Sequence, residues 1–226
     1  MDIHFHHTDH YLNDIWDLEE THKIAEIVIA NKELLTDFAD FILNSTTIKK
    51  YKTRRVEMLT AYNNSPLNKI LKLFKQALKK ININGENKRD NLNRLRGAIL
   101  EILIYQIVLD RFEQNAHNCR VKINSKTINH NGKKTIDIAC YSKKENKATF
   151  FECKVHPYWF NDKEFGYLNK LFSSLNEDIK DLLVAGVSLD YEIFVENKFN
   201  ENNIKNIRPF GRRKIEELIE NIDGVA

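Results

Sequence analysis

Two acidic side chains and a lysine stand in segments that otherwise have the composition of buried strands. Asp137 lies in TIDIACY (135–141), and Glu152 and Lys154 lie in ATFFECKV (148–155). Two carboxylates with an open coordination sphere suit Mg²⁺, which prefers oxygen ligands and keeps waters that a substrate phosphate can replace. A lysine beside the ion could orient the attacking water or stabilise charge that grows on the phosphate oxygens. These residue types therefore indicate hydrolysis of a phosphodiester.

The expected strands determine whether the three side chains can meet. Side chains alternate between faces along a strand, so Glu152 and Lys154 should share one face, and Cys153 should point to the other. If the two runs are neighbouring antiparallel strands joined through SKKENK (142–147), Asp137 comes to lie on the same face as Glu152. We therefore expect two carboxylates and one ammonium group at a single place.

Each of these residues also has a simpler explanation when it is taken alone. Asp137 could cap a turn, and Glu152 and Lys154 could form an ion pair on a solvated edge. The set is harder to explain in that way, because a phenylalanine precedes Glu152 on its face and isoleucines flank Asp137. A solvated face would carry polar residues at every second position instead.

A third carboxylate occurs in a segment that should be a buried helix. LNRLRGAILEILIYQIVLDRF (92–112) is apolar on all sides from Ala98 to Leu109, except at Glu101 and Gln106. Burying an unpaired carboxylate costs several kcal/mol, so Glu101 needs a cation or a proton. The metal site or the neighbouring Arg96 could supply that partner, and the sequence leaves both open.

The remaining periodicities predict the architecture that would hold these residues. Spacings of three and four residues predict helices within 15–43 and 65–81, and we assign residues 1–90 to an N-terminal helical region. Short β-rich runs at 119–123, 135–141 and 148–155 predict a three-stranded meander. A helix (162–181), a fourth strand (182–189) and a closing helix (212–222) should complete a core over 91–226. The expected fold class is α/β (α+β).

This order of residues resembles the PD-(D/E)XK nuclease superfamily, to which many restriction endonucleases and DNA-repair nucleases belong. The resemblance covers roughly residues 92 to 190 and does not extend to the first 90. One departure is the isoleucine before Asp137, where the family pattern often has proline. The residues that match the pattern are the helical Glu101, then Asp137, and then Glu152, Cys153 and Lys154.

The resemblance implies both a fold and an activity. The fold would be a restriction-endonuclease-like mixed β-sheet core flanked by helices. The activity would be Mg²⁺-dependent cleavage of phosphodiester bonds, in which Mn²⁺ can substitute. By the same resemblance, Asp137, Glu152 and the backbone carbonyl of Cys153 would bind the metal. Lys154 would assist the attacking water, and Glu101 would support the metal site as a further ligand.

Several basic segments could meet a nucleic acid. The stretch RPFGRRK (208–214) combines cations with an aromatic ring, and its candidate nucleic-acid-binding residues are Arg208, Arg212, Arg213 and Lys214. KKYKTRR (49–55) and the lysines at 69, 72, 75 and 79 could also hold phosphates. Lysines opposite an apolar stripe usually form only a solvated helix face, so residues 208–214 are the better candidate, although a solvated surface explains them equally well.

Two further segments invite a functional interpretation. HFHHTDH (4–10) is rich in histidine, but its spacing matches no metal signature, and we expect a mobile chain end. Tyr158, Trp159 and Phe160 follow the expected strand 148–155 and could stack on a base, although packing against the next helix is the expectation. His156 could touch a substrate phosphate, but we expect an ordinary surface residue.

Composition excludes several classes of protein. The chain has 226 residues, a formal net charge of +3 and three cysteines without a CxxC pair, so neither a zinc site nor a disulfide framework is indicated. No apolar run approaches the roughly 20 residues of a membrane span, and the first residues lack the pattern of a secretory signal. We expect a cytoplasmic protein without a membrane partner.

Three functions are compatible with these observations. The first is an endonuclease acting on DNA rather than RNA, in restriction, repair or defence against phage. It could act as a homodimer or with a partner subunit held through the N-terminal helices. The second is a nucleic-acid-binding or interaction subunit of the same fold that does not cleave. The third is a helical regulatory or scaffold protein in which the match to the pattern is accidental.

Overall fold

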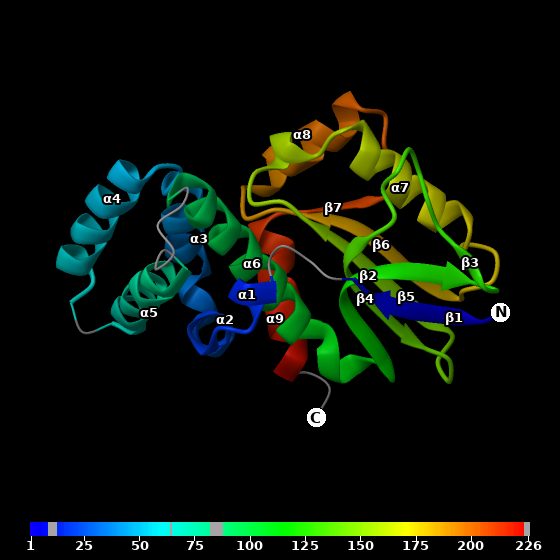
Figure 1. Cartoon of the computed structure of the whole chain (residues 1–226), viewed down its shortest axis with the longest axis horizontal. Helices are drawn as coiled ribbons and strands as arrows, with labels where there is room; N and C mark the ends of the chain where they lie inside the picture. The colour runs from blue at the N-terminus through cyan, green and yellow to red at the C-terminus, as the bar shows by residue number, and fades with distance from the viewer. Residues whose placement is uncertain (9–12, 64, 82–87, 224–226) are drawn as a thin grey trace. The chain divides into compact units, whose positions relative to one another are not determined.

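A computed structural model of the chain describes residues 1–8, 13–63, 65–81 and 88–223 and has a mixed α/β fold (Figure 1). The chain forms two compact units, each assembled from separate parts of the sequence. The sheet unit consists of residues 1–10 and 108–214, and the helical unit consists of residues 11–107 and 215–226. This division differs from the predicted boundary between residues 90 and 91. Residues 3–7 pair with a strand of the sheet unit, and residues 91–107 and 215–226 belong to the helical unit.

The sheet unit is built on an open mixed sheet of seven strands within the described residues. Its strands run in the order β1-β2-β4-β5-β6-β7, and β3 pairs with β2. The pairs from β1 to β5 are antiparallel, whereas β6 lies parallel to β5 and β7 lies parallel to β6. The strands are β1 (Ile3–His7), β2 (Gln114–Ile123), β3 (Lys126–Thr127), β4 (Ile136–Ser142), β5 (Lys147–Cys153), β6 (Asp181–Val187) and β7 (Arg208–Phe210).

Two helices cover one face of this sheet, as Figure 1 shows. They are α7 (Asp162–Ser173) and α8 (Glu192–Glu201), and the short 3-10 helix η3 (Pro157–Trp159) precedes α7. Phe165 of α7 and Phe199 of α8 belong to the same buried apolar cluster as Phe150 of β5. Phe150 and Glu152 share a face of β5 because they are two residues apart. The covered face of the sheet is therefore the face that carries Glu152.

The helical unit is built from helices that bury aromatic side chains. Phe38, Phe41 and Phe74 are fully buried in it, and the Phe41 and Phe74 ring centroids lie 5.1 Å apart. The helices are α1 (Asn13–Trp16), α2 (Glu19–Ala30), α3 (Leu35–Asn44), α4 (Ile48–Ala61), α5 (Pro66–Ile81) and α6 (Lys88–Val108). Helix α9 (Arg212–Asp223) begins in the sheet unit and continues into the helical unit. The short 3-10 helix η1 (Lys32–Leu34) precedes α3, and the short 3-10 helix η2 (Leu109–Arg111) follows α6.

A buried arginine attaches α6 to the N-terminal helices. Arg96 is inaccessible to solvent, and its guanidinium donates hydrogen bonds to the backbone oxygens of Ile42 at 2.7 Å and Leu43 at 3.2 Å. These two carbonyls lie near the end of α3, and hydrogen bonds from a charged donor are among the stronger ones in proteins. Helix α6 thus belongs with the helices that precede it, although the sequence analysis grouped it with the strands that follow.

Most expected elements are present, and several others were missed. The meander of β2, β4 and β5, the parallel strand β6 and the helices α7 and α9 lie where the periodicity placed them. The strands β1, β3 and β7 and the helices α4 and α8 were not expected. The prediction of a mobile histidine-rich end is wrong for His4, His6 and His7, because β1 pairs with β2 over its whole length. Asp9 and His10 lie outside the described residues. None of the described helices is both long and apolar enough to cross a lipid bilayer.

Candidate functional site

Strands β4 and β5 bring Asp137 and Glu152 to the same place in the sheet. Their antiparallel register pairs Ile138 with Phe151, so the next step of the ladder places Asp137 opposite Glu152. Directly opposed residues of neighbouring strands have their Cβ atoms about 4.5–5.5 Å apart and point to the same face. The two carboxylates, which lie fifteen positions apart in the sequence, therefore meet on the face covered by α7 and α8.

Lys154 joins the two carboxylates from the residue after β5. Its backbone N–H donates to the Val187 oxygen at 2.9 Å, which extends the pairing of β5 with β6 by one residue. Its Nζ lies 2.5 Å from Glu152 Oε1 and 3.9 Å from Asp137 Oδ2. The structure thus brings together the three residues on which the sequence analysis relied.

The three side chains differ in their access to solvent. The Glu152 side chain is fully buried, whereas 13% of Asp137 and 22% of Lys154 remain exposed. Asp137 Oδ2 also accepts a 2.7 Å hydrogen bond from the backbone N–H of Cys153, which fixes the orientation of that carboxylate. Solvent therefore does not reach the Glu152 side chain, whereas it reaches small parts of the Asp137 and Lys154 side chains.

A second lysine, which the sequence analysis missed, completes the site. Lys133 Nζ lies 3.0 Å from Glu152 Oε1, the same oxygen that Lys154 contacts, and its side chain is 15% exposed. Lys133 stands at the end of a tight turn closed by its bridge to His130. Its ammonium lies 5.9 Å from the ring centroid of Tyr167 on α7. Two carboxylates and two ammonium groups thus balance one another.

Burial and neighbouring charges move the pKa values of these groups in different directions. Burial first, and then the charge of Glu152, raise the pKa of Asp137 to about 6. Burial would also raise the pKa of Glu152, but the charges and hydrogen bonds of Lys154 and Lys133 outweigh it and lower that pKa. Burial opposes the charge of Lys154, yet Glu152 and Asp137 together raise the pKa of that ammonium well above its ordinary value. Glu152 and Lys154 are therefore charged at neutral pH.

One oxygen of this site is suited to a metal ion. Glu152 Oε2 is buried and has no hydrogen-bond partner among the described residues, although leaving such an acceptor unsatisfied costs free energy. No group of three or more His, Cys, Asp or Glu side chains that could hold a metal is found in the described part of the chain. Asp137 and Glu152 offer two carboxylates, a set that would fit Mg²⁺ because this ion commonly retains several waters.

The other residues assigned to the metal site lie in different surroundings. Cys153 points away from Glu152 on β5, and its thiol side chain is buried. Only its backbone carbonyl remains a candidate ligand. Glu101 lies on α6 of the helical unit and is 6% exposed, whereas Asp137, Glu152 and Lys154 belong to the sheet unit. The support of the metal site by Glu101 stays a prediction.

The four candidate nucleic-acid-binding residues divide into two pairs. Arg208 and Arg213 are exposed. Arg212 is buried, donates from Nε to the Leu189 oxygen at 2.6 Å and lies 4.2 Å from the Tyr191 ring centroid. Lys214 donates to the Pro209 oxygen and contacts a glutamate of α8 at 3.3 Å. Arg208 and Arg213 are thus accessible to solvent, whereas Arg212 is buried and Lys214 is only partly exposed.

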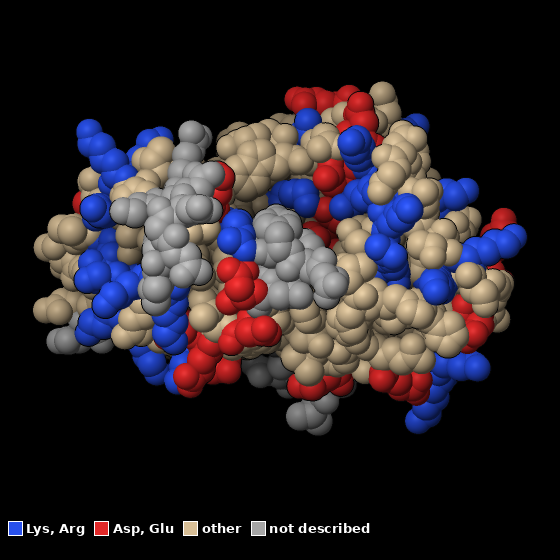
Figure 2. Space-filling view, in the orientation of Figure 1, with Lys and Arg blue, Asp and Glu red and all other residues tan. Residues whose placement is uncertain are grey.

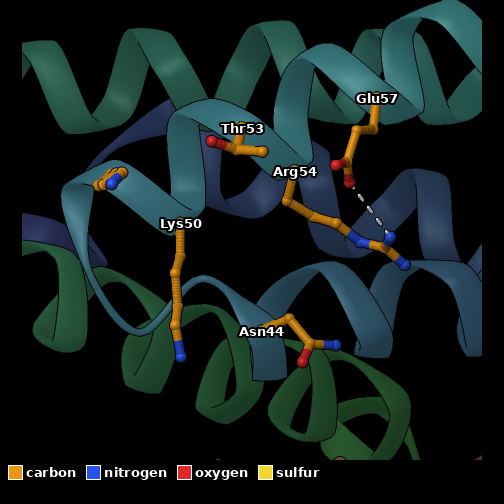
Figure 3. A pocket seen from close by; sticks show the side chains of 6 residues that line it. Asn44, Lys50, Thr53, Arg54 and Glu57 are labelled. Atoms are coloured by element: carbon orange, nitrogen blue, oxygen red, sulfur yellow. Dashed lines mark hydrogen bonds and ion pairs between the residues drawn. The ribbon is translucent and has the colours of Figure 1, made fainter.

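The helical unit carries a separate basic surface over α4 and α5, visible in Figure 2 as a gathering of Lys and Arg. A hollow of about 540 Å³ lies beside α4, and Figure 3 shows the side chains around it. Arg54 Nη1 is 3.4 Å from Glu57 Oε2 there. The lining residues are Asn44, Lys49, Lys50, Thr53, Arg54 and Glu57. The lysines at 69, 72, 75 and 79 of α5 are exposed opposite its buried apolar side chains, as on a solvated face.

No family model matches the chain, and no curated protein matches it. The fold and the site still define a class of protein. It is a mixed α/β protein whose central antiparallel strands present two carboxylates and two lysines on one helix-covered face.

Proposed function

We propose that the chain is a Mg²⁺-dependent endonuclease of the PD-(D/E)XK kind that hydrolyses phosphodiester bonds in DNA. The observation that carries the proposal is the convergence of Asp137, Glu152 and Lys154, with Glu152 Oε1 and Asp137 Oδ2 at 2.5 and 3.9 Å from the same ammonium. A sheet that joins an antiparallel meander to two parallel strands also supports the finer assignment to a restriction-endonuclease-like fold.

The two carboxylates would hold the ion. Asp137 and Glu152 would contribute oxygen ligands, and the carbonyl of Cys153 would be a third. A bound Mg²⁺ would supply positive charge for the phosphate oxygens and lower the pKa of an attacking water. Glu152 suits this role because one of its oxygens is buried without a hydrogen-bond partner among the described residues. Mn²⁺ should substitute, since it prefers similar ligands.

The two lysines would act as hydrogen-bond donors. The charges of Glu152 and Asp137 raise the pKa of Lys154 well above its ordinary value, which favours this side chain as a protonated hydrogen-bond donor over a role as a general base. It would instead orient the attacking water and stabilise the negative charge that develops on the phosphate oxygens. Lys133 holds the same Glu152 oxygen, and it could turn to a phosphate oxygen once a metal ion neutralises that carboxylate.

Plasmid cleavage tests the proposal. Purified protein should nick or linearise supercoiled DNA in the presence of Mg²⁺ or Mn²⁺ and should leave it intact in the presence of EDTA. Asp137→Ala and Lys154→Ala should each lower the rate by at least roughly 100-fold, the cost of losing one transition-state contact. Circular dichroism should show that both variants keep their fold.

Matched controls separate chemistry from a general loss of charge. Asp181→Ala and Lys134→Ala remove the same charges from exposed positions and should cut at the wild-type rate. Cutting that persists in the Asp137 and Lys154 variants would refute the assignment of the site. Binding of DNA without any cutting, with either ion, would instead indicate a subunit that only binds nucleic acid.

A further inference from the structure

Two short segments of the sheet unit expose an unusual number of large apolar side chains. Five of the seven exposed large apolar residues among those described lie in 158–159 and 191–194. We call this set the aromatic edge, and it consists of Tyr158, Trp159, Tyr191, Ile193 and Phe194. Tyr158 is 61% exposed and Phe194 is 54% exposed, whereas the neighbouring Phe160 is buried. Apolar surface gathered in this way on a soluble unit commonly marks a binding site.

The topology of the sheet places the aromatic edge beside the candidate site. Strands β5 and β6 are parallel, and their register pairs Cys153 with Val187, so both strands end at the same edge of the sheet. The segment with Tyr158 begins a few residues after Lys154, and the segment with Tyr191 follows the end of β6. His156 Nδ1 lies 4.0 Å from Asp190 Oδ2, which brings the two segments into contact.

The rings of the first segment are arranged as a platform. The His156 ring stacks on Tyr158, with centroids 4.9 Å apart and planes at 21°. Trp159 stands edge-on to both rings, at 5.2 Å from His156 and 5.7 Å from Tyr158. Rings held by one another in this way lose little conformational entropy when a flat ligand binds, because each side chain is already oriented.

Cations also lie at this edge of the sheet. Strand β7 is parallel to β6, with Val187 paired to Phe210, so the exposed Arg213 follows the same edge. Lys163, in the first turn of α7, is exposed as well, and Lys154 lies at the candidate site itself. Aromatic rings together with cations are the means by which proteins hold unpaired nucleic acid, since rings stack on bases and cations meet phosphates.

We propose that the aromatic edge binds unpaired bases of DNA next to the cleavage site, so that the substrate is single-stranded DNA or DNA with a single-stranded stretch. The proposal rests on the proposed function, because it identifies the substrate class of that site. A second copy of the chain fits less well, since a stable protein interface takes about 800 Å² and 20 or more residues from each partner. Paired bases offer no free faces to these rings.

Tryptophan fluorescence tests the proposal directly. The chain has two tryptophans, and Trp16 is buried whereas Trp159 is exposed. The full-length protein, in EDTA so that nothing is cut, is titrated with a single-stranded DNA oligonucleotide of roughly 12 nucleotides. The oligonucleotide should quench the fluorescence of the wild type. Trp159→Ala lacks this reporter, so the affinities of the variants are measured by the anisotropy of a dye-labelled oligonucleotide, and Trp159→Ala and Phe194→Ala should each weaken binding by roughly tenfold. Val56→Ala, which removes an exposed apolar side chain from α4, should bind as the wild type does.

An abasic oligonucleotide of the same length separates stacking from phosphate binding. It should bind more weakly than the base-bearing strand and equally well to the wild type and to Trp159→Ala. Equal affinity for the two oligonucleotides, or full affinity in both edge variants, would overturn the proposal. So would edge variants that change the oligomeric state in light scattering while DNA binding is unchanged. A wild type that binds the strand through Trp159 but, with Mg²⁺ or Mn²⁺, cuts neither plasmid nor the single-stranded oligonucleotide would leave base binding at the aromatic edge standing and remove the nuclease assignment alone.

Discussion

Lys133 Nζ lies 3.0 Å from Glu152 Oε1, and this contact joins a surface turn to a carboxylate that solvent does not reach. The same oxygen also receives Lys154 at 2.5 Å. A buried carboxylate is costly unless cations and hydrogen bonds meet it, and here two ammonium groups do so. The four charged groups are therefore a unit, and the removal of any one changes the state of the others.

Replacing Lys133 by methionine should destabilise the protein at neutral pH. Glu152 would keep only one of its two cations, and we expect a loss of about 1–3 kcal/mol in the free energy of unfolding by urea at pH 7. The lowered pKa of Glu152 contributes stability above its ordinary pKa of 4.5, and this contribution disappears as the pH falls below that value. The difference between Lys133→Met and the wild type should shrink accordingly in acid. Lys134→Met, at an exposed neighbour, should be neutral, and equal stability of Lys133→Met and the wild type at pH 7 would contradict the prediction.

Replacing Asp137 by asparagine should stabilise the protein above pH 6. The pKa of Asp137 is raised from 3.8 to about 6, so between these values the folded protein holds a proton that the unfolded chain has released. Stability therefore falls as the pH rises through this window, and the full difference is on the order of 3 kcal/mol at about 1.4 kcal/mol per pH unit. Urea denaturation from pH 4 to pH 8 should show Asp137→Asn gaining on the wild type as the pH rises.

The exposed Asp181 provides the control for that series. Asp181→Asn should follow the wild type within about 0.5 kcal/mol at every pH, since its side chain is 65% exposed. A variant Asp137→Asn that is less stable than the wild type at pH 8 would show that burial does not dominate at Asp137.

Binding of Mn²⁺ should depend on both carboxylates and on pH. Glu152→Gln should weaken Mn²⁺ binding at least tenfold in calorimetry at pH 7.5, because a charged oxygen ligand is replaced by a neutral one. The affinity of the wild type should fall about tenfold for each pH unit below 6, where Asp137 takes up a proton that the ion must displace. Glu145→Gln, in the exposed turn between β4 and β5, should leave the affinity unchanged. Equal affinity in Glu152→Gln and the wild type would place the ion elsewhere.

The sequence could predict the meeting of Asp137, Glu152 and Lys154 because strand alternation and a short connection determine it locally. Lys133 escaped prediction because it lies in a polar turn without periodicity, and only the packing of that turn against α7 brings it to Glu152. Arg212 was predicted to bind nucleic acid because the sequence of a basic cluster does not show which of its side chains are buried in the fold. Strand β1 was missed since its pairing partner, β2, lies more than 100 residues away.

A methyl group added at Gly186 should destabilise the sheet unit. Gly186 is paired with Glu152 in the register of β5 and β6, and an added Cβ would lie 2.4 Å from the Phe199 ring and 3.0 Å from the Phe160 ring. Both rings are buried, so they can move only by disturbing the core, and we expect Gly186→Ala to lose about 1–3 kcal/mol. Gly97→Ala makes the same change inside α6, where the added Cβ would meet no described atom within 4 Å apart from its chain neighbours and the backbone of its own helix, and should gain about 0.5–1 kcal/mol. Thermal denaturation of both variants measures the two signs, and a Gly186→Ala variant at least as stable as the wild type would contradict this account.

Arg212 and Arg213 are adjacent in the sequence but should respond to substitution in opposite ways. Arg212→Met removes the 2.6 Å hydrogen bond to the Leu189 oxygen and the contact with the Tyr191 ring, leaving a buried carbonyl without its donor. We expect it to lower the free energy of unfolding by about 1–3 kcal/mol. Arg213→Ala changes an exposed side chain, so stability should stay within about 0.5 kcal/mol of the wild type.

If Arg213 contacts a phosphate, its loss should weaken DNA binding and reduce the slope of log affinity against log salt by about 1. Denaturation and salt-dependent titration on both variants decide the matter, and an Arg213 variant with an unchanged salt slope would exclude this arginine from the DNA interface.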